Sequence, residues 1–415
     1  MNRERVVITG LGAITPLGSS VDLFWNGLIK GVSGVRKITQ FDASIYPYQI
    51  AGEIPDFDPE QYLDRKEARR FPRSAQIALA SAIQAVKDAG LPESMVEKER
   101  SAVVYGTALG GLDQMEEEII VLRTQGLKKV NPFTLALTIP NLSAFLIARQ
   151  FQCLGPNKTI VTACATGTQT IGEAAELVRH GYADVVITGG TESLLKDYSV
   201  AGFCAMRAVP VNYNDNPQAA SRPFDAAREG FILSEGAGTM VVERLEHALQ
   251  RDAHIYAEIV GQSSSSDAFH IAQPDPDAKG PSRAMRWALA DAGISPTQID
   301  YINAHGTSTP LNDVTETKAI KAVFGEHAYK LAVSSTKSMI GHAMGASGTL
   351  EAIACTLTIV NSLIHPTINY TTPDPECDLD YVPNTARQQD VQYALSNSFG
   401  LGGQNACLIL KKYEG

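Results

Sequence analysis

Two short stretches of this chain repeat one pattern, and they decide the fold that the sequence predicts. The first is TACATG at residues 162–167, which follows a β-branched run and leads into a helical pattern over 166–180. The second is STK at 335–337 with GHAMGASG at 341–348, again between a short strand and a helix, here over 346–360. Each turn offers reactive side chains at the carboxyl end of a strand, where α/β sheets bind ligands. The repeat therefore predicts two similar α/β halves with one site between them.

The rest of the chain alternates short β-branched runs with longer helical stretches, which is typical of layered α/β proteins. The expected strands are 5–9, 102–106, 157–162, 184–188, 238–243, 257–263, 301–304, 332–334, 394–398 and 406–411, and the expected helices are 75–89, 166–180, 281–292, 313–324 and 346–360. Residues 203–230 are rich in Asn, Pro, Arg and Asp and are expected to form a surface excursion. No Pro/Gly/Ser-rich linker separates the halves, so we expect one compact body divided into 1–250 and 251–415.

Composition excludes several classes of function. The 415 residues are 44% hydrophobic and 19% charged, with a formal net charge of -10, which argues against binding nucleic acid or an anionic membrane. No apolar run approaches the ~18 residues that span a bilayer. The six cysteines lack paired spacing, so we expect reduced thiols in a cytoplasmic protein. No motif for a bound cofactor or a catalytic metal is present.

Cys164 is the candidate nucleophile. It lies where a strand meets a helix, among small residues that leave room for an acyl group. The dipole and free N–H groups of a helix N-terminus stabilise a thiolate, so we expect a lowered thiol pKa and an oxyanion site there. The alternative is a buried structural cysteine, which is the usual state of an isolated Cys.

Two histidines lie on similar turns. His305 stands in NAHGTSTP at 303–310, directly after a hydrophobic strand, and His342 stands in the GHAMGASG turn. Each taken alone is more often a satisfied surface or core residue, but together with Cys164 they indicate a catalytic set. GLGAIT at 10–15 follows a strand as a dinucleotide fingerprint does, but it lacks the third glycine. The spacing of Cys164 and His305 is like that of papain-type proteases, but the local cysteine context differs.

Four further stretches identify a family resemblance: VVITGLG at 6–12, DNPQAASRPFD at 215–225, SSTKS at 334–338 and NSFGLGG at 397–403. With the Cys–His–His set they resemble the elongating β-ketoacyl-[acyl carrier protein] synthases of the synthase I/II type, closest to synthase II, over essentially the whole chain. The resemblance implies a thiolase-like fold, an α/β body layered α-β-α-β-α. Initiating synthases pair Cys and His with Asn, and thiolases carry a second catalytic cysteine.

The resemblance implies a decarboxylating condensation in fatty-acid elongation. Cys164 would hold the acyl chain as a thioester, and His305 and His342 would hold the malonyl thioester oxygen as CO2 leaves. Lys337 would orient the histidines with Glu351 beside it, and the N–H groups of Cys164 and Leu401 would form the oxyanion hole. A structural monovalent cation would fall on Asn303, Glu351, Ser396 and Asn397.

The resemblance also implies partners. Substrate and pantetheine contacts would come from Thr307, Thr309, Phe399, Leu401, Leu109 and Phe203, although the two threonines can also be read as turn hydroxyls that cap a helix. An acidic acyl carrier protein would dock on Lys66, Arg69, Arg70, Lys128, Lys129 and Arg207, unless these basic residues form only a solvated face. The family forms homodimers, so a homodimer is expected here.

Departures from the family pattern leave the substrate open. Leu401 stands where Phe is usual, Gln404 and Ala272 replace threonines, and Ile340 stands where Thr is common. One alternative is therefore a specialised ketosynthase for polyene or polyketide-like chains, working alone or with a partner subunit. A chain-length-factor-like subunit typically lacks the cysteine, and a thiolase would need a second one near the C-terminus, so the sequence disfavours both.

Overall fold

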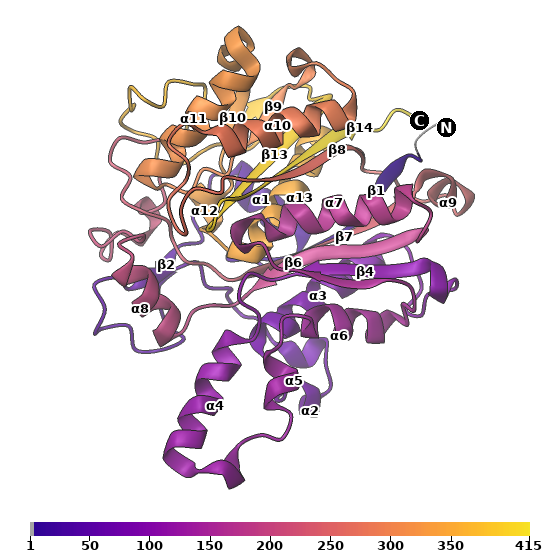
Figure 1. The fold of residues 1–415 in the computed structure, drawn as a ribbon, viewed down its shortest axis with the longest axis vertical. Coiled ribbons are helices and arrows are strands. Elements are labelled where there is room, and N and C mark those ends of the chain that lie inside the picture. The colour runs from indigo at the N-terminus through magenta and orange to yellow at the C-terminus, as the bar shows by residue number, and fades with distance from the viewer. Residues whose placement is uncertain (1–3) are drawn as a thin grey trace.

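The framework of the molecule is a ten-stranded sheet, seen in a computed structural model that describes residues 4–415 (Figure 1). Its strand order is β10-β9-β13-β14-β8-β1-β7-β6-β4-β5. The strands are β1 Val6–Ile14, β4 Ser101–Gly106, β5 Asn157–Ile160, β6 Val185–Glu192, β7 Gly236–Arg244, β8 Ala257–Ser266, β9 Tyr301–Asn303, β10 Ala332–Ser334, β13 Tyr393–Gly400 and β14 Gln404–Lys412. Two short pairs lie outside it: β2 Arg36–Lys37 with β3 Ile50–Ala51, and β11 Leu363–Ile364 with β12 Arg387–Gln388. The ten strands expected from the sequence are all present, with shifted ends.

The sheet consists of two halves with the same topology. On one side β5, β4 and β6 run parallel to one another. Next to them β7 is antiparallel to β6, and β1 is antiparallel to β7. On the other side β10, β9 and β13 run parallel to one another. Next to them β14 is antiparallel to β13, and β8 is antiparallel to β14. The halves meet where β1 pairs with β8 through Val7–Glu258 and Ile8–Ala257. The internal repeat in the sequence is therefore a repeat of strand order and direction.

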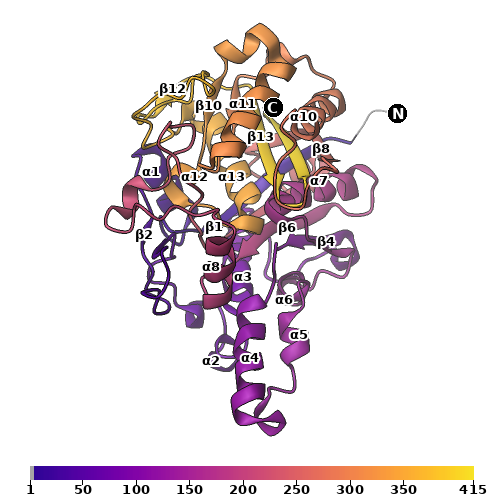
Figure 2. The ribbon, with the colours of Figure 1, turned by 60° about the vertical axis from the view of Figure 1, so that its left-hand side comes forward.

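Helices cover both faces of each half and form the expected α-β-α-β-α layers (Figures 1 and 2). The helices are α1 Val21–Ile29, α2 Arg65–Ala68, α3 Arg73–Asp88, α4 Leu112–Gln125, α5 Thr134–Thr138, α6 Leu142–Phe151, α7 Thr166–Arg179, α8 Asp197–Ala205, α9 Leu245–Gln250, α10 Lys279–Ala292, α11 Pro310–Phe324, α12 Lys337–Ile340 and α13 Ser347–Asn361. The pair α7 and α13 packs together in the middle layer, with α3 and α6 outside one half and α10 and α11 outside the other.

Glycines bring the N-termini of the two central helices into contact. A Cβ on Gly167 would lie 2.6 Å from the backbone N of Thr349, and one on Gly348 would lie 2.4 Å from the backbone N of Thr168. Real Cβ atoms do not approach a backbone that closely, so each position needs glycine. This contact places the 162–167 and 341–348 turns side by side.

Among the helices of residues 4–415, eight were not expected from the sequence: α1, α2, α4, α5, α6, α8, α9 and α12. Helices α4 and α5 form an arm that projects from the lower end of the molecule (Figures 1 and 2). Apolar side chains of α4, such as Ile119 and Ile120, are about half exposed, so this helix lacks the core-facing apolar stripe by which a surface helix is identified. Within residues 4–415, no helix is both long and apolar enough to cross a membrane.

Candidate active site

Cys164 lies in a single 3-10 turn, Ala163–Ala165, immediately before α7. Ala163 has a positive φ of 50°, so the chain turns sharply as it presents the cysteine. The end of β13 closes on this turn, because a Cβ on Gly400 would lie 3.1 Å from the backbone N of Cys164. The backbone N–H of Leu401 thereby contacts the Cys164 thiol, as does the N–H of Cys164 itself. These are the two N–H groups expected to form the oxyanion hole.

The protonation of Cys164 differs from the expectation. Burial raises the pKa of its thiol to about 11, whereas the Leu401 N–H and the Lys337 charge act in the opposite direction. The lowered pKa expected from the helix N-terminus is therefore wrong for the free protein. Desolvation of a thiolate in a site that is only 5% exposed outweighs the donors around it.

The two histidines lie beside the thiol. The ligand atoms of Cys164, His305 and His342 all lie within 4.8 Å of one another, although they come from three distant parts of the chain. The two rings are perpendicular, with centroids 5.4 Å apart. Burial lowers the pKa of both histidines well below the usual value, and the nearby Lys337 charge lowers it further. Both rings are therefore neutral, as the assigned donor role requires.

Lys337 fixes the tautomer of His305. Its Nζ lies 3.3 Å from His305 Nδ1 and forms a buried ion pair with Glu351. An ammonium group can only donate, so His305 Nδ1 must accept. The proton of neutral His305 is then on Nε2, the opposite side of the ring. Lys337 and Glu351 come from α12 and α13, so their contact is tertiary, as expected.

The thiol and both histidines open into one cavity of about 460 Å³. Thr307, Thr309, Phe399, Leu401 and Arg207 also line it, each of them a predicted substrate or carrier residue. Leu109 and Phe203 do not line this cavity. Leu109 is 45% exposed after β4, and Phe203 packs edge-on against Phe231, with ring centroids 5.3 Å apart.

Of the two threonines, Thr309 caps a helix as the alternative interpretation expected, and both residues line the cavity. The Thr307 and Thr309 hydroxyls lie 2.9 Å apart at the cavity wall. Thr309 is also the N-cap of α11, and its hydroxyl accepts from the backbone N–H of Asn312. A capping hydroxyl keeps a free lone pair, so the cap is compatible with a ligand contact.

Near Lys337, three buried oxygen atoms have no hydrogen-bond partner among residues 4–415: Asn303 Oδ1, Glu351 Oε2 and Ser396 Oγ. Asn303 and Ser396 are neighbours in the β9–β13 register, and Cys355, one turn after Glu351, lies against both. Oxygen atoms left unpaired in a buried site are the ligands that a hard cation takes. The three residues therefore fit the expected monovalent cation.

The Asn397 side chain does not join these oxygens. Its Nδ2 donates to Glu316 at 3.2 Å, and its Oδ1 accepts from the Cys407 thiol at 3.1 Å. Successive strand residues point to opposite faces of a sheet, so Asn397 faces away from its neighbour Ser396. The expectation is wrong for the Asn397 side chain.

Two buried glutamates hold the site turns and were not predicted. Glu316 on α11 accepts the N–H groups of His305 and Gly306, both at 2.8 Å. Glu192 at the end of β6 accepts from Ala108 at 2.7 Å and from Gly345 at 3.2 Å, joining the turns after β4 and before α13. Burial raises the pKa of each carboxyl to about 7. Nothing in the local sequence distinguishes either residue from a solvated acid.

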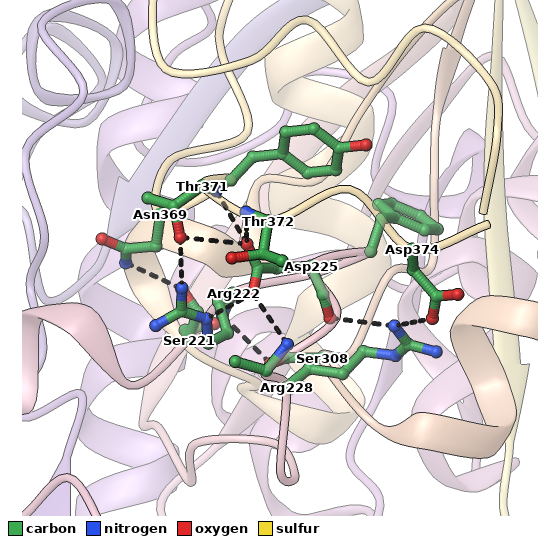
Figure 3. Close-up of polar contacts among 12 residues, drawn as sticks. Ser221, Arg222, Asp225, Arg228, Ser308, Asn369, Thr371, Thr372 and Asp374 are labelled. Atoms are coloured by element: carbon green, nitrogen blue, oxygen red, sulfur yellow. Dashed lines mark hydrogen bonds and ion pairs between the residues drawn. The ribbon is translucent and has the colours of Figure 1, made fainter. Parts of the chain in front are cut away.

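An ion-pair network supports the His305 turn from outside (Figure 3). Asp225 accepts from Arg222 at 3.0 Å, and the Arg222 backbone N–H donates to Ser308 Oγ at 3.0 Å. Arg228 donates to the carbonyl of Thr309 at 3.3 Å. The segment expected to be a surface excursion is therefore partly buried, and it braces the turn that carries His305 and the two threonines.

The predicted docking residues fall into two groups. Arg207 follows α8 and lines the cavity. The other five lie at α2 and at the tip after α4, around the arm: Lys66, Arg69, Arg70, Lys128 and Lys129. Of these, Arg70 lies over the ring of Phe133 at 4.2 Å and is only partly exposed.

Comparison with known proteins agrees with this architecture. Residues 3–248 match the β-ketoacyl synthase N-terminal domain and residues 256–371 match the C-terminal domain. The chain is 48% identical over 414 residues to 3-oxoacyl-[acyl-carrier-protein] synthase 2 of Synechocystis, covering 100% of this chain and 99% of the relative. It is likewise 48% identical to the synthase 2 of Staphylococcus aureus, covering 99% of both chains.

Solved structures agree as well. The ishigamide ketosynthase/chain length factor superposes with a TM-score of 0.93 at 37% identity, covering 99% of this chain and 100% of that one. A ketosynthase of a type II PKS, solved with its acyl-carrier protein, gives 0.92 at 36% identity, covering 100% of both chains. A β-ketoacyl synthase from Burkholderia phymatum gives 0.92 at 35%, covering 99% and 100%. The chain belongs to the β-ketoacyl synthase family and has its thiolase-like fold.

Proposed function

We propose that this acyltransferase condenses an acyl group bound to Cys164 with malonyl-[acyl carrier protein], giving 3-oxoacyl-[acyl carrier protein] and CO2 in fatty-acid elongation. One observation carries the proposal. A thiol with two backbone N–H groups lies within 4.8 Å of two neutral histidines in one cavity. The thiol supplies a nucleophile, and the histidines supply donors for a second oxyanion.

The first step is thiol–thioester exchange. Cys164 Sγ attacks the acyl thioester carbonyl, and the N–H groups of Cys164 and Leu401 hold the oxyanion that forms. The bond to the pantetheine sulfur then breaks, and the proton of the Cys164 thiol ends on the departing pantetheine thiol. Because a proton moves from one thiol to another, the step is balanced although the Cys164 pKa is about 11.

The second step is decarboxylation. The malonyl carboxylate leaves as CO2, and its electron pair passes to the thioester carbonyl, forming an enolate. The Nε2–H groups of His305 and His342 hold that oxygen, so donors lie where charge develops. The enolate carbon attacks the acyl-Cys164 carbonyl and a carbon–carbon bond forms. The carbon–sulfur bond to Cys164 then breaks, and the departing thiolate takes one proton from solvent to restore the thiol. The product is longer by two carbons.

The pantetheine arm would occupy the cavity. Thr307 and Thr309 offer hydroxyls to its amides, and Phe399 and Leu401 border the thiol. Arg207 at the cavity, with Lys66, Arg69, Arg70, Lys128 and Lys129, offers positive charge to an acidic carrier on a chain of net charge -10. Leu109 and Phe203 would contact the acyl chain behind Cys164, because Phe203 belongs to the apolar cluster that contains the thiol.

The protein would be a homodimer. Each chain would consist of two halves, residues 1–250 and residues 251–415. Edge strand β5 is unpaired on one side, and large apolar side chains are exposed on the arm, residues 112–139. These are Met115, Ile119, Ile120, Leu122, Leu127, Phe133, Leu135 and Ile139. An open edge strand and an exposed apolar surface each favour association with a second copy. A monovalent cation on Asn303, Glu351 and Ser396 would stabilise the Lys337 site. Six free thiols suit a cytoplasmic location.

Fatty-acid elongation is favoured over a specialised substrate because the synthase 2 relatives are 48% identical, against 37% for the ishigamide ketosynthase. The test is condensation of malonyl carrier protein with acyl carriers of graded length, read by intact mass. Two-carbon extension of saturated chains, absent in Cys164→Ala, is expected. Acylation of Cys164 without any extension would instead indicate an unusual substrate or a partner subunit, and no acylation at all would contradict the proposal.

A further inference from the structure

Ser347, the first residue of α13, forms a buried hydrogen bond with a catalytic histidine. Its Oγ lies 2.9 Å from His342 Nδ1, and its side chain is 0% exposed. The hydroxyl has no other partner among residues 4–415. On the other side of the ring, Nε2 of His342 is buried without a partner and borders the cavity. We propose that Ser347 is a positioning residue that fixes His342 as the Nε2–H tautomer, an inference that rests on the proposed function.

The direction of this hydrogen bond follows from what each atom can do. A serine hydroxyl has one hydrogen to donate, and a buried hydrogen without an acceptor costs free energy. In the described part of the chain, His342 Nδ1 is the one acceptor that Ser347 Oγ contacts. The hydroxyl therefore donates, Nδ1 accepts, and the single proton of the neutral ring is placed on Nε2.

The tautomer decides whether His342 can donate a hydrogen bond to the enolate oxygen. Because burial holds the His342 pKa well below the usual value, the ring carries one proton and cannot donate from both nitrogens. With that proton on Nδ1, Nε2 would present a lone pair to the enolate oxygen and repel it. With the proton on Nε2, the ring donates at the point where negative charge develops.

His305 has the same arrangement with a different donor. Lys337 occupies its Nδ1, so His305 also presents Nε2–H. Lys337 and Ser347 thus act as a matched pair, one for each histidine. Each donates to the Nδ1 atom of one ring, so that the Nε2–H groups of both rings face a single oxygen.

The position of the His342 ring does not depend on Ser347. Its backbone N–H donates to the Ile232 carbonyl at 2.7 Å, and Phe231 packs edge-on against the ring at 5.5 Å. Removing the hydroxyl should therefore release the tautomer and leave the ring in place. The expected effect of Ser347→Ala therefore differs from that of a variant that displaces the His342 ring.

The test measures the two half-reactions separately in Ser347→Ala. Decarboxylation of malonyl carrier protein, followed as CO2 release, should fall about tenfold or more, because one oxyanion donor is weakened. Acylation of Cys164 by acyl carrier protein should stay within about twofold, because its oxyanion contacts backbone N–H groups instead. Thr356→Val, which removes another buried hydroxyl of α13 that bonds only within the helix, should leave both rates unchanged. Equal loss of both half-reactions, or no loss in either, would overturn the proposal.

A second readout does not depend on the reaction. In protein carrying ¹⁵N-labelled histidine, the His342 resonances, assigned with His342→Ala, should show Nδ1 unprotonated and Nε2 protonated. In Ser347→Ala the Nδ1 signal should shift toward the protonated form, and Ser347→Cys, which keeps a weak donor, should shift it less. A protonated Nδ1 in the wild-type protein would refute the assignment of the tautomer even if the enzyme condenses. An inactive wild-type protein with the expected tautomer would instead count against the proposed function.

Discussion

At the scale of single residues, the proposed reactivity of Cys164 depends on the N–H donors around it. It does not require the thiol to be ionised in the resting protein. Its thiol is buried, and its pKa is raised to about 11. At neutral pH only about one molecule in ten thousand would hold the thiolate. The two N–H groups at the sulfur act on the thioester oxyanion during acyl transfer, so catalysis does not need an ionised resting state.

Alkylation of Cys164 should therefore depend steeply on pH. Only the thiolate reacts with iodoacetamide, so the rate at Cys164 should rise about tenfold per pH unit from pH 7 to 10. The rate should level off only near pH 11, because the folded-state pKa lies there. Peptide mass mapping separates Cys164 from the partly exposed Cys204. A rate that levels off below pH 8 would show that the thiolate is stabilised after all.

The sequence predicts those site residues that stand on exceptional turns, and it does not predict those that support them. Cys164 and His305 lie between small residues after a strand, and His342 lies between Gly341 and Ala343 after the short helix α12, a pattern of small residues that indicates a site. Glu192 and Glu316 are buried and contact residues outside their own elements, and Ser347 contacts His342 through a turn whose geometry the sequence does not give. A glutamate in a helix or at a strand end reads as a solvated acid unless its tertiary partners are known.

At the scale of elements, the site depends on the contact between the N-termini of α7 and α13. Gly167 and Gly348 let these helices approach, and each carries part of the chemistry at its start. A side chain at either position would separate Cys164 from His342. The small-residue pattern of both turns is therefore a packing requirement as well as a binding one.

Adding one methyl group at this contact should be costly. Gly348→Ala would place a Cβ 2.4 Å from a backbone nitrogen, so we expect the free energy of unfolding to fall by about 1–3 kcal/mol, with loss of condensation. Gly202→Ala is the matched control, since no atom lies within 4 Å of its Cβ position in α8. It should be neutral or should stabilise the protein by about 0.5–1 kcal/mol. Equal denaturant midpoints for the two variants would contradict this account.

The strands are predicted correctly from the sequence because their apolar, β-branched runs correspond to buried residues. The ten main strands are β-branched runs in a sheet covered on both faces, and all were predicted. Eight helices were missed, among them α6 with a buried face. For α4 and α5 the reason is that exposed residues such as Ile119 and Leu135 do not follow a core-facing stripe. The apolar residues of these two helices would be buried only against a surface from outside the single chain.

At the scale of the whole molecule, two copies of one topology share one site. The nucleophile comes from the half that contains β5 and α7, and the histidines come from the half that contains β9 and α13. Neither half holds both the acylation and the decarboxylation machinery. Eight exposed large apolar side chains gather between residues 115 and 139 of the arm, and the proposed second copy would cover them.

Light scattering in solution should give twice the chain mass of 44.5 kDa. The double variant Ile119→Glu with Leu135→Glu places charge on the arm and should shift the protein toward the monomer, because burying an unpaired charge is unfavourable. Leu249→Glu, at a comparably exposed apolar position on α9, should leave the mass unchanged. A wild-type protein that is monomeric at micromolar concentration would contradict the homodimer.

The most direct test of the central claim is to measure both half-reactions in Cys164→Ala and His305→Ala. If the thiol and the histidines divide the work as proposed, Cys164→Ala takes up no acyl group but still releases CO2 from malonyl carrier protein. His305→Ala should form the acyl-enzyme at nearly the wild-type rate and release CO2 at least about 100-fold more slowly. If His305→Ala instead decarboxylates normally, or Cys164→Ala still becomes acylated, this division of roles is wrong.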